Sequence, residues 1–268
     1  MELSKNLVAA LNLITFILSI PILGAGIWLA SSHHTDCIGF LQGPVIAIGL
    51  FMLLISIAGF VGAYMRITWL LWVYLLVMFL LIVLLFCFTV FSFAVTNKGA
   101  GEALSGKGYK DYRLGDYSTW LQRRVRSSEN WKHIRSCIVD AQVCDSLKVY
   151  KLASEFYRAE LSSVQSGCCK PPTACNFLFI NATYWGRPLT EDADPDCHRY
   201  SYEQSELCFD CDSCKAGIVD KVRRDWRKVA TINIVIFFLL IIVYSVGCHS
   251  FHRAQEEGTY ARYGKGII

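Results

Sequence analysis

Four long stretches without Asp, Glu, Lys or Arg constrain this chain more than any other feature. They cover residues 7–30, 42–65, 69–95 and 229–250. An α-helix needs about 20 apolar residues to cross the roughly 30 Å hydrocarbon core of a bilayer. Each stretch is long enough, whereas a helix buried in a soluble core is typically shorter. The sequence therefore predicts four membrane-spanning helices in an all-α membrane protein.

The first stretch follows Lys5 and invites comparison with a secretory signal. Its apolar core exceeds the ~7–15 residues of a typical signal peptide, so we expect an uncleaved first span. The remaining segments are then an N-terminus, a small loop, a tight turn, a large loop and a tail. They cover residues 1–6, 31–41, 66–68, 96–228 and 251–268, respectively.

Two signals disagree about which side of the membrane the large loop occupies. Lys5, Arg66 and Arg253 mark the termini and the tight turn as cytosolic. The basic run 221–228, just before the fourth span, would by itself place the large loop in the cytosol. Long loops, however, translocate largely regardless of charge. We interpret the run as the solvated start of a helix, with attraction to anionic headgroups or to an acidic partner as the alternative.

Cysteine usage favours a large loop outside the cytosol. The loop holds nine of the 12 cysteines, a density typical of an oxidising compartment. It also carries the acceptor triplet Asn181-Ala182-Thr183 for N-glycosylation, which is used only in the secretory lumen. We therefore expect both termini in the cytosol and both loops outside, in a multi-pass protein of the plasma membrane.

The stretch GCCKPPTAC, residues 167–175, places two cysteines side by side. Consecutive Cα atoms lie ~3.8 Å apart, below the usual disulfide range of about 4.4–6.8 Å. We therefore expect Cys168 and Cys169 to bridge to different, more distant cysteines. Gly167 is expected to permit an unusual backbone conformation beside the pair. The candidate partners are Cys175, Cys197, Cys208, Cys211 and Cys214.

The other cysteines leave alternatives open. Cys137 and Cys144 are close enough in sequence to bridge each other, and Cys37 either bridges to the large loop or stays a free thiol. The stretch CFDCDSC, residues 208–214, has the C-x-x-C spacing of zinc and iron–sulfur ligands and of redox pairs. An oxidising compartment favours disulfides over both, so we expect no metal and no cofactor.

Helical periodicity marks two segments of the large loop. One stripe is Val149, Leu152, Ala153, Phe156, Tyr157 and Leu161, and another is Tyr117, Trp120, Leu121 and Val125. Apolar residues at this spacing predict helices with one buried face. The alternative is that one stripe forms a partner-binding face.

Small and polar residues within the spans indicate how these helices pack. Helices in lipid approach through small side chains and a few polar contacts. The second span offers Gly59 and Gly62, and the first offers Asn12, Gly24 and Gly26. Asn12 is expected to face the bundle, because an amide exposed to lipid is costly. Cys248, at the inner end of the fourth span, is a palmitoylation candidate.

Several motifs together resemble the plant-type branch of the tetraspanin family. They are GCCKPP at 167–172, CDSCKAG at 211–217 and SIPILGAGIWLA at 19–30. The resemblance implies four transmembrane helices under a mostly helical, disulfide-stapled large extracellular loop. It also implies palmitoylation and roles in cell differentiation, patterning, senescence and secreted vesicles.

No catalytic motif or phosphate loop is present, and the histidines are scattered along the chain. The absence of charged residues in the spans argues against an ion-coupled transporter, because such proteins usually place ionisable groups in the membrane. We therefore expect a non-enzymatic scaffold that associates with other membrane proteins, including further tetraspanins, within the lipid bilayer. We expect no nucleic-acid partner. The alternatives are a receptor for a soluble ligand or a four-span channel.

Overall fold

The computed structural model describes residues 2–31, 36–65, 67–99, 101–190 and 193–264. The chain divides into two compact units. We call residues 1–34, 38–90 and 231–268 the membrane unit, and residues 35–37 and 91–230 the loop unit. The boundary between the two falls within three long helices.

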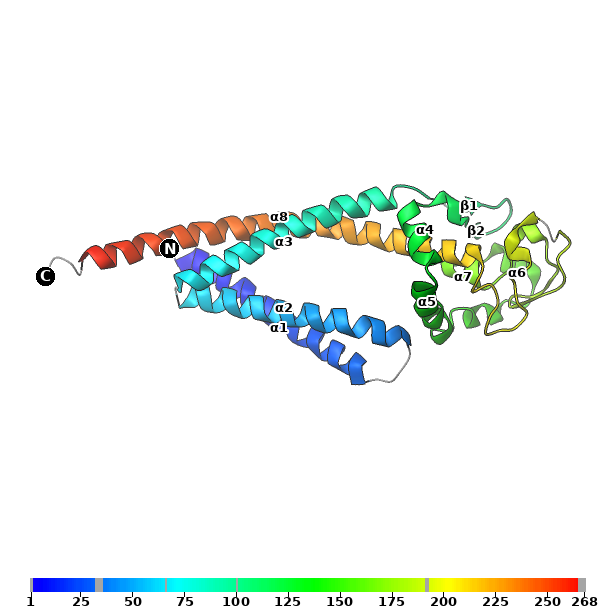
Figure 1. Cartoon of the computed structure of the whole chain (residues 1–268), viewed down its shortest axis with the longest axis horizontal. Helices are drawn as coiled ribbons and strands as arrows, with labels where there is room; N and C mark the ends of the chain where they lie inside the picture. The colour runs from blue at the N-terminus through cyan, green and yellow to red at the C-terminus, as the bar shows by residue number, and fades with distance from the viewer. Residues whose placement is uncertain (1, 32–35, 66, 100, 191–192, 265–268) are drawn as a thin grey trace. The chain divides into compact units, whose positions relative to one another are not determined.

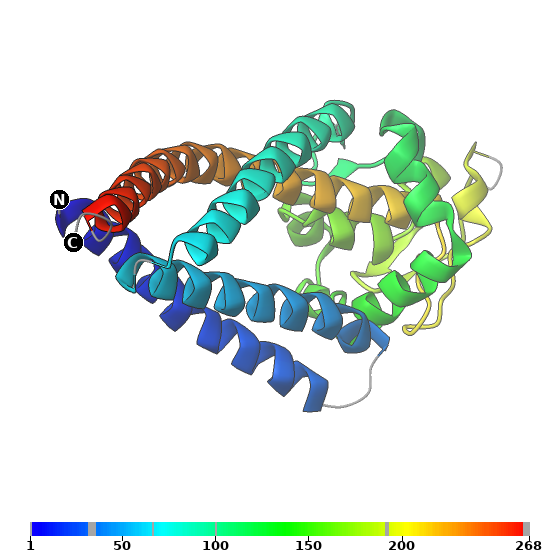
Figure 2. The same cartoon turned by 60° about the vertical axis from the view of Figure 1, so that its left-hand side comes forward.

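Four long helices supply the membrane unit (Figure 1). They are α1 (Glu2–Ser31), α2 (Asp36–Tyr64), α3 (Thr68–Thr96) and α8 (Asp212–Gly264). Each contains a stretch long and apolar enough to cross a membrane: Val8–Trp28, Gln42–Gly62, Trp69–Thr96 and a part of Asp212–His249. In both side views, α1 and α2 run beside each other in opposite directions (Figures 1 and 2). The chain is thus a multi-pass membrane protein.

The helices extend beyond the apolar stretches that predicted them. The α2 helix begins at Asp36, inside the segment expected to be the small loop. The α8 helix begins at Asp212 and continues to Gly264, so the fourth apolar stretch is the middle of a longer helix. Hydropathy predicts only the part of a helix that is apolar enough to lie in lipid. The helical hydrogen bonds can continue into the polar residues on either side until the helix is capped.

Asn12 joins three helices of the membrane unit. Its Nδ2 donates to the carbonyl of Val8 at 2.9 Å and to the hydroxyl of Tyr74, on α3, at 3.3 Å. A Cβ at Gly59, on α2, would overlap the Asn12 amide. Gly59 therefore leaves room for a polar contact between α1 and α3.

Other glycines differ in what they contribute to helix packing. A Cβ at Gly26 would lie 2.8 Å from the side chain of Ile46, so α1 and α2 approach closely there. Gly62 lies near the backbone of Leu71 at the start of α3. Gly24, in contrast, has no atom within 4 Å of its Cβ position, so the expected packing role is wrong for this glycine.

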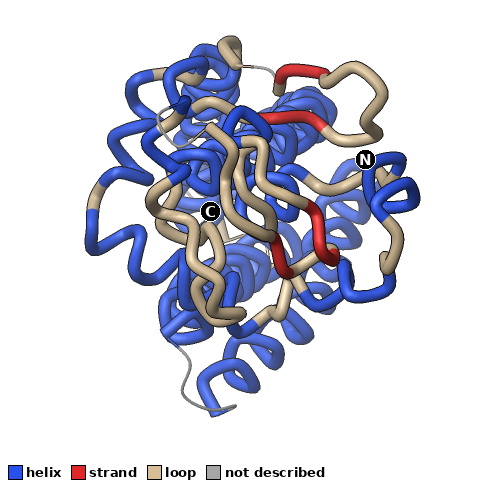
Figure 3. Tube along the Cα trace, turned by 90° about the vertical axis from the view of Figure 1, so that its right-hand side faces the viewer, coloured by secondary structure: helices blue, strands red, loops and turns tan. Residues whose placement is uncertain are grey.

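The loop unit is mostly helical with two short hairpins, drawn in red in Figure 3. Its α-helices are α4 (Thr119–Arg126), α5 (Ser128–Asp140), α6 (Ala153–Arg158), α7 (Ser163–Cys168) and the first part of α8. Its 3₁₀ turns are η1 (Leu114–Asp116), η2 (Asp145–Val149), η3 (Thr173–Cys175) and η5 (Pro195–Cys197). The hairpins pair β1 (Glu102–Ala103) with β2 (Lys110–Asp111), and β3 (Phe179–Asn181) with β4 (Tyr184–Trp185).

Phe156, on α6, lies at the centre of the loop unit's core and is fully buried. Its ring meets those of both hairpins and of the segments around α6. These rings belong to Tyr109, Tyr150, Tyr157, Phe179 and Trp185. Aromatic pairs at such separations are favourable beyond the area they bury, so Phe156 ties α6 to the β3–β4 hairpin.

The predicted helix around Phe156 is wrong in its first half. The structure has the 3₁₀ turn η2 and then the short α6, in place of one continuous helix. Val149 and Leu152 are exposed, at 69% and 59%. The helix predicted from the second stripe is present, and Leu121 and Val125 form the buried face of α4. Tyr117 is also buried, but it precedes that helix.

Candidate interaction surface of the large loop

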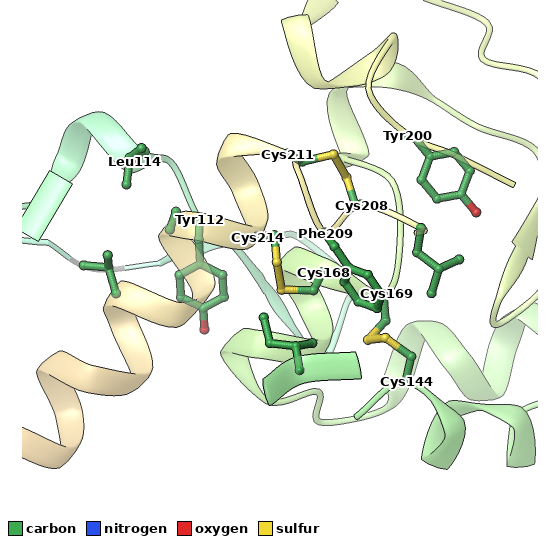
Figure 4. Packing of buried hydrophobic residues seen from close by; sticks show 14 of the residues in the cluster. Tyr112, Leu114, Cys144, Cys168, Cys169, Tyr200, Cys208, Phe209, Cys211 and Cys214 are labelled. Carbon is green, nitrogen blue, oxygen red and sulfur yellow. A yellow bond between two sulfur atoms is a disulfide. The ribbon is translucent and has the colours of Figure 1, made fainter. Parts of the chain in front are cut away.

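The vicinal cysteines Cys168 and Cys169 bridge to two different segments (Figure 4). Cys168 is bonded to Cys214 in the first turns of α8, and Cys169 is bonded to Cys144 just before η2. The pair thus draws segments 25 and 46 residues away to the end of α7. Cys144 was not among the expected partners, and the local bridge from Cys137 to Cys144 is wrong.

Glycines permit the close approach of α7 and α8 at this bridge. A Cβ at Gly167 would overlap the carbonyl oxygen of Ser213, and a Cβ at Gly217 would overlap that of Ser163. Gly167 lies inside α7 and does not have positive φ, so the expected unusual conformation is wrong. The residue is glycine because a backbone from another helix occupies the place of its side chain.

Two further disulfides lie in the second half of the loop. Cys175 is bonded to Cys197, and Cys208 is bonded to Cys211. The C-x-x-C pair is therefore a disulfide in this structure. Among the described residues, no group of three or more His, Cys, Asp or Glu side chains is placed to hold a metal ion.

Two further cysteines, Cys137 and Cys37, were predicted as candidates for disulfides. Cys137, on α5, is disulfide-bonded. The side chain of Cys37 lies outside the described residues, so the predicted bridge from the small loop stays a prediction.

Lys170 is a buried charged residue that the sequence reasoning did not single out. Its side chain is only 2% exposed, and its Nζ lies 2.9 Å from Asp111 on β2. It also donates to the carbonyl of Pro171 and lies over the ring of Tyr109. Burial lowers the pKa of Lys170, although Asp111 favours its ammonium. Its place inside GCCKPP was the available signal.

Burial and the ion pair also shift the pKa of Asp111. Burial favours the neutral acid, but the Lys170 ammonium and its hydrogen bond outweigh burial and hold the pKa of Asp111 below its usual value. Each charge of a buried pair is costly without the other. The pair therefore fixes the GCCKPP segment to the β1–β2 hairpin.

The β3–β4 hairpin presents one face to the core and one to solvent. Phe179 and Trp185 pack against each other and against Phe156. Exposed apolar side chains lie on the hairpin, directly before it and in the segments that follow it. We call this set the hairpin patch: Leu178, Ile180, Tyr184, Leu189 and Tyr202, exposed by 44–78%. The alternation of Leu178, Phe179 and Ile180 was the sequence signal for it.

The turn of this hairpin carries the glycosylation acceptor. Asn181 is exposed, and its side-chain oxygen accepts hydrogen bonds from the backbone N–H and the hydroxyl of Thr183. This local Asx-type turn leaves the amide at the tip of the hairpin. A glycan there would be a neighbour of Ile180.

The remaining predicted modification site lies in the membrane unit. Cys248, on α8, is a free thiol and is partly buried against the cluster that contains Leu71 and Tyr74. The structure thus brings it close to α3 rather than leaving it fully exposed.

A comparison with family models finds a match over residues 4–250 to the Tetraspanin family. The chain belongs to the tetraspanins. This tetraspanin is 53% identical over 266 residues to Tetraspanin-8 of Arabidopsis thaliana, with 97% of each chain covered. It is 46% identical over 267 residues to Protein TORNADO 2 of the same plant, with 99% of each covered. The resemblance read from GCCKPP and the predicted fold class are confirmed.

Membership in the tetraspanin family indicates the general kind of function. Tetraspanins are generally non-enzymatic membrane scaffolds that interact with other membrane proteins in the bilayer. The match covers both units, including all four apolar stretches. The coarse function of this tetraspanin therefore lies in binding and arrangement within a membrane.

Proposed function

We propose that this tetraspanin organises other membrane proteins laterally and that the hairpin patch is its principal contact surface. The observation that carries the proposal is an exposed apolar surface on a covalently framed support. Five large apolar side chains lie on one hairpin, directly before it or in the segments that follow it, and Leu189 is 78% exposed. Clustered apolar side chains on a protein surface are typical of interaction sites.

The disulfide frame gives this surface a fixed shape. The hairpin begins four residues after Cys175, and the bridge from Cys175 to Cys197 closes the segment that contains it. A surface ordered before binding loses less conformational entropy when a partner binds. The patch therefore suits protein partners, including further copies of tetraspanins in homo- and hetero-oligomers.

The proposal includes a location and two modifications. The loop unit lies outside the cell, both termini lie in the cytosol, and the plasma membrane is the resident membrane. Asn181 carries a glycan and Cys248 carries a palmitoyl chain. By resemblance to its family, the protein acts in cell differentiation or development.

Site-specific photo-crosslinking in intact cells tests the contact surface. A photoreactive amino acid replaces Leu178 or Leu189 in the hairpin patch, and Lys132, exposed on α5, serves as the control position. We expect adducts with integral membrane proteins from both patch positions and at most background from position 132. Equal adduct yields at all three positions would contradict the proposed surface.

The identity of the adducts separates the organiser from the receptor. Membrane-spanning adducts support lateral organisation. Adducts that are exclusively secreted, soluble proteins would instead support a receptor for a soluble ligand.

A further inference from the structure

An aromatic cluster joins α4 to the outer end of α3. The ring of Trp120, on α4, lies 5.3 Å from Phe91 and 5.9 Å from Trp226 of α8. Phe91 lies five residues before the end of α3, about 7.5 Å along the helix axis. The apolar stretch of α3 ends at Thr96. Trp120 and Trp226 therefore lie at the edge of the hydrocarbon core, where tryptophan is enriched.

The α4 helix lies across the direction of α8's first part in both side views (Figures 1 and 2). Residues three or four positions apart share one face of a helix. Arg123 and Arg124 therefore share a face with Trp120, while Leu121 and Val125 are buried against the loop unit's core. Arg126, six positions after Trp120, points about 120° away from that residue around the helix axis and lines a cleft of ~650 Å³ with Glu102 and Asp194.

The two arginines beside Trp120 are exposed and lack a carboxylate partner among the described residues. The guanidinium of Arg124 lies 5.0 Å from the centre of the Trp120 ring. Two positive groups thus lie beside the aromatic cluster.

The neighbouring arginines of α8 are engaged within the protein. Arg223 and Arg224 contact the buried carboxylate of Asp220 at 3.3 and 2.9 Å. Arg223 and Arg227 donate to the carbonyl of Thr96 at 3.2 and 2.9 Å. That carbonyl is at the last residue of α3, where cations are favourable. The basic run is therefore partly structural, whereas Arg123 and Arg124 on α4 are exposed.

We propose that Arg123 and Arg124, with Trp120, form a binding site for an anionic phospholipid headgroup in the leaflet beside the loop unit. Trp120 anchors the site at the hydrocarbon edge, and the guanidinium groups bind the phosphate and a further acidic group of the headgroup. Guanidinium matches phosphate geometry with two parallel hydrogen bonds. An acidic protein segment fits this position less well, because Phe91 of the same cluster is 39% exposed within the membrane span.

Native mass spectrometry of the full chain in mild detergent tests the site. The protein is titrated with dioleoyl phosphatidylserine or, as a neutral comparison, dioleoyl phosphatidylcholine. We expect tighter binding of phosphatidylserine. The R123Q/R124Q variant should weaken its binding about fivefold per arginine, or about 25-fold in total.

Two further variants separate charge on this face from charge in general. R126Q removes one positive charge from the same helix at a position that points away from Trp120 and lines the cleft, and should change phosphatidylserine binding less than twofold. R123K/R124K keeps both charges and should retain most of the binding. All three variants alter exposed side chains, so each should yield the wild-type disulfide map and gel-filtration profile.

The proposal is overturned if R123Q/R124Q binds phosphatidylserine as the wild type does, or if R126Q loses as much binding as the double variant. Equal affinity of the wild type for phosphatidylcholine overturns the preference for anionic headgroups. A co-purifying protein that is lost from R123Q/R124Q while lipid binding is unchanged would assign this face to an acidic protein partner instead.

Discussion

Replacing Phe156 with alanine should loosen the β3–β4 hairpin and with it the hairpin patch. The Phe156 side chain is completely buried and touches the rings of Phe179 and Trp185 on the hairpin. Removing a buried phenylalanine side chain costs about 3–5 kcal/mol, because both its burial and its neighbours' contacts are lost. A shorter but still apolar side chain in Phe156→Leu should cost less than about 1.5 kcal/mol.

Hydrogen exchange of the full chain in detergent, followed by mass spectrometry, measures this effect on the hairpin. For amides that exchange only when this part of the core opens, the protection factor falls in proportion to the full change in the free energy of opening. Because 1.4 kcal/mol is a factor of ten, the predicted loss is roughly two to three and a half powers of ten for residues 179–185. The photo-crosslinking yield from Leu178 should fall in the same variant.

Val149→Ala is the matched control for this experiment. Val149 belongs to the same apolar stripe in the sequence but is 69% exposed. Substitution at an exposed position away from special features typically changes stability by less than about 0.5 kcal/mol. Equal exchange rates in Phe156→Ala and Val149→Ala would refute the assignment of Phe156 as the residue that holds the hairpin.

Two other predictions concern single contacts within the loop unit. Gly217→Ala should destabilise the loop unit by about 1–3 kcal/mol in a urea titration monitored by proteolysis, because a backbone carbonyl occupies the place of the new methyl group. The control is Gly115→Ala, which should leave the stability unchanged because no atom lies within 4 Å of the Cβ position of Gly115. Asp111→Asn should cost about 3 kcal/mol at pH 7, because Lys170 stays buried without its partner. The folded-state pKa of Asp111 is lowered, so its contribution to the stability of the folded state is present above about pH 4 and is lost as the pH falls further. At low pH the variant and the wild type should therefore have the same free energy of unfolding. A constant difference down to pH 2 would show that the contribution is not electrostatic.

The membrane architecture was accessible from sequence because a few local rules decide it. Charge-free stretches of more than 20 residues have few alternatives to spanning helices. The vicinal cysteines were similarly constrained, since adjacent Cα atoms are too close for an ordinary disulfide. Both arguments depend on residues next to each other in the chain, and neither needs knowledge of distant contacts.

The features that sequence reasoning missed depend on contacts between distant segments. Val149 has helical spacing to Phe156, yet the chain turns between them and exposes Val149. Cys144 lies seven residues from Cys137, but the fold places it beside Cys169. Gly167 is explained by Ser213, 46 residues away, rather than by its own backbone conformation. Periodicity and spacing do not report which segments meet.

The disulfide map of the protein taken from its native membrane tests the central claim, that an extracytosolic, covalently framed loop unit supports the hairpin patch. Digestion without reduction, with thiols blocked at lysis, followed by mass spectrometry gives the connectivity. The account predicts peptides that join Cys168 to Cys214 and Cys144 to Cys169. Quantitatively alkylated Cys168 and Cys169 would contradict it, because the loop would then be unstapled and in a reducing compartment.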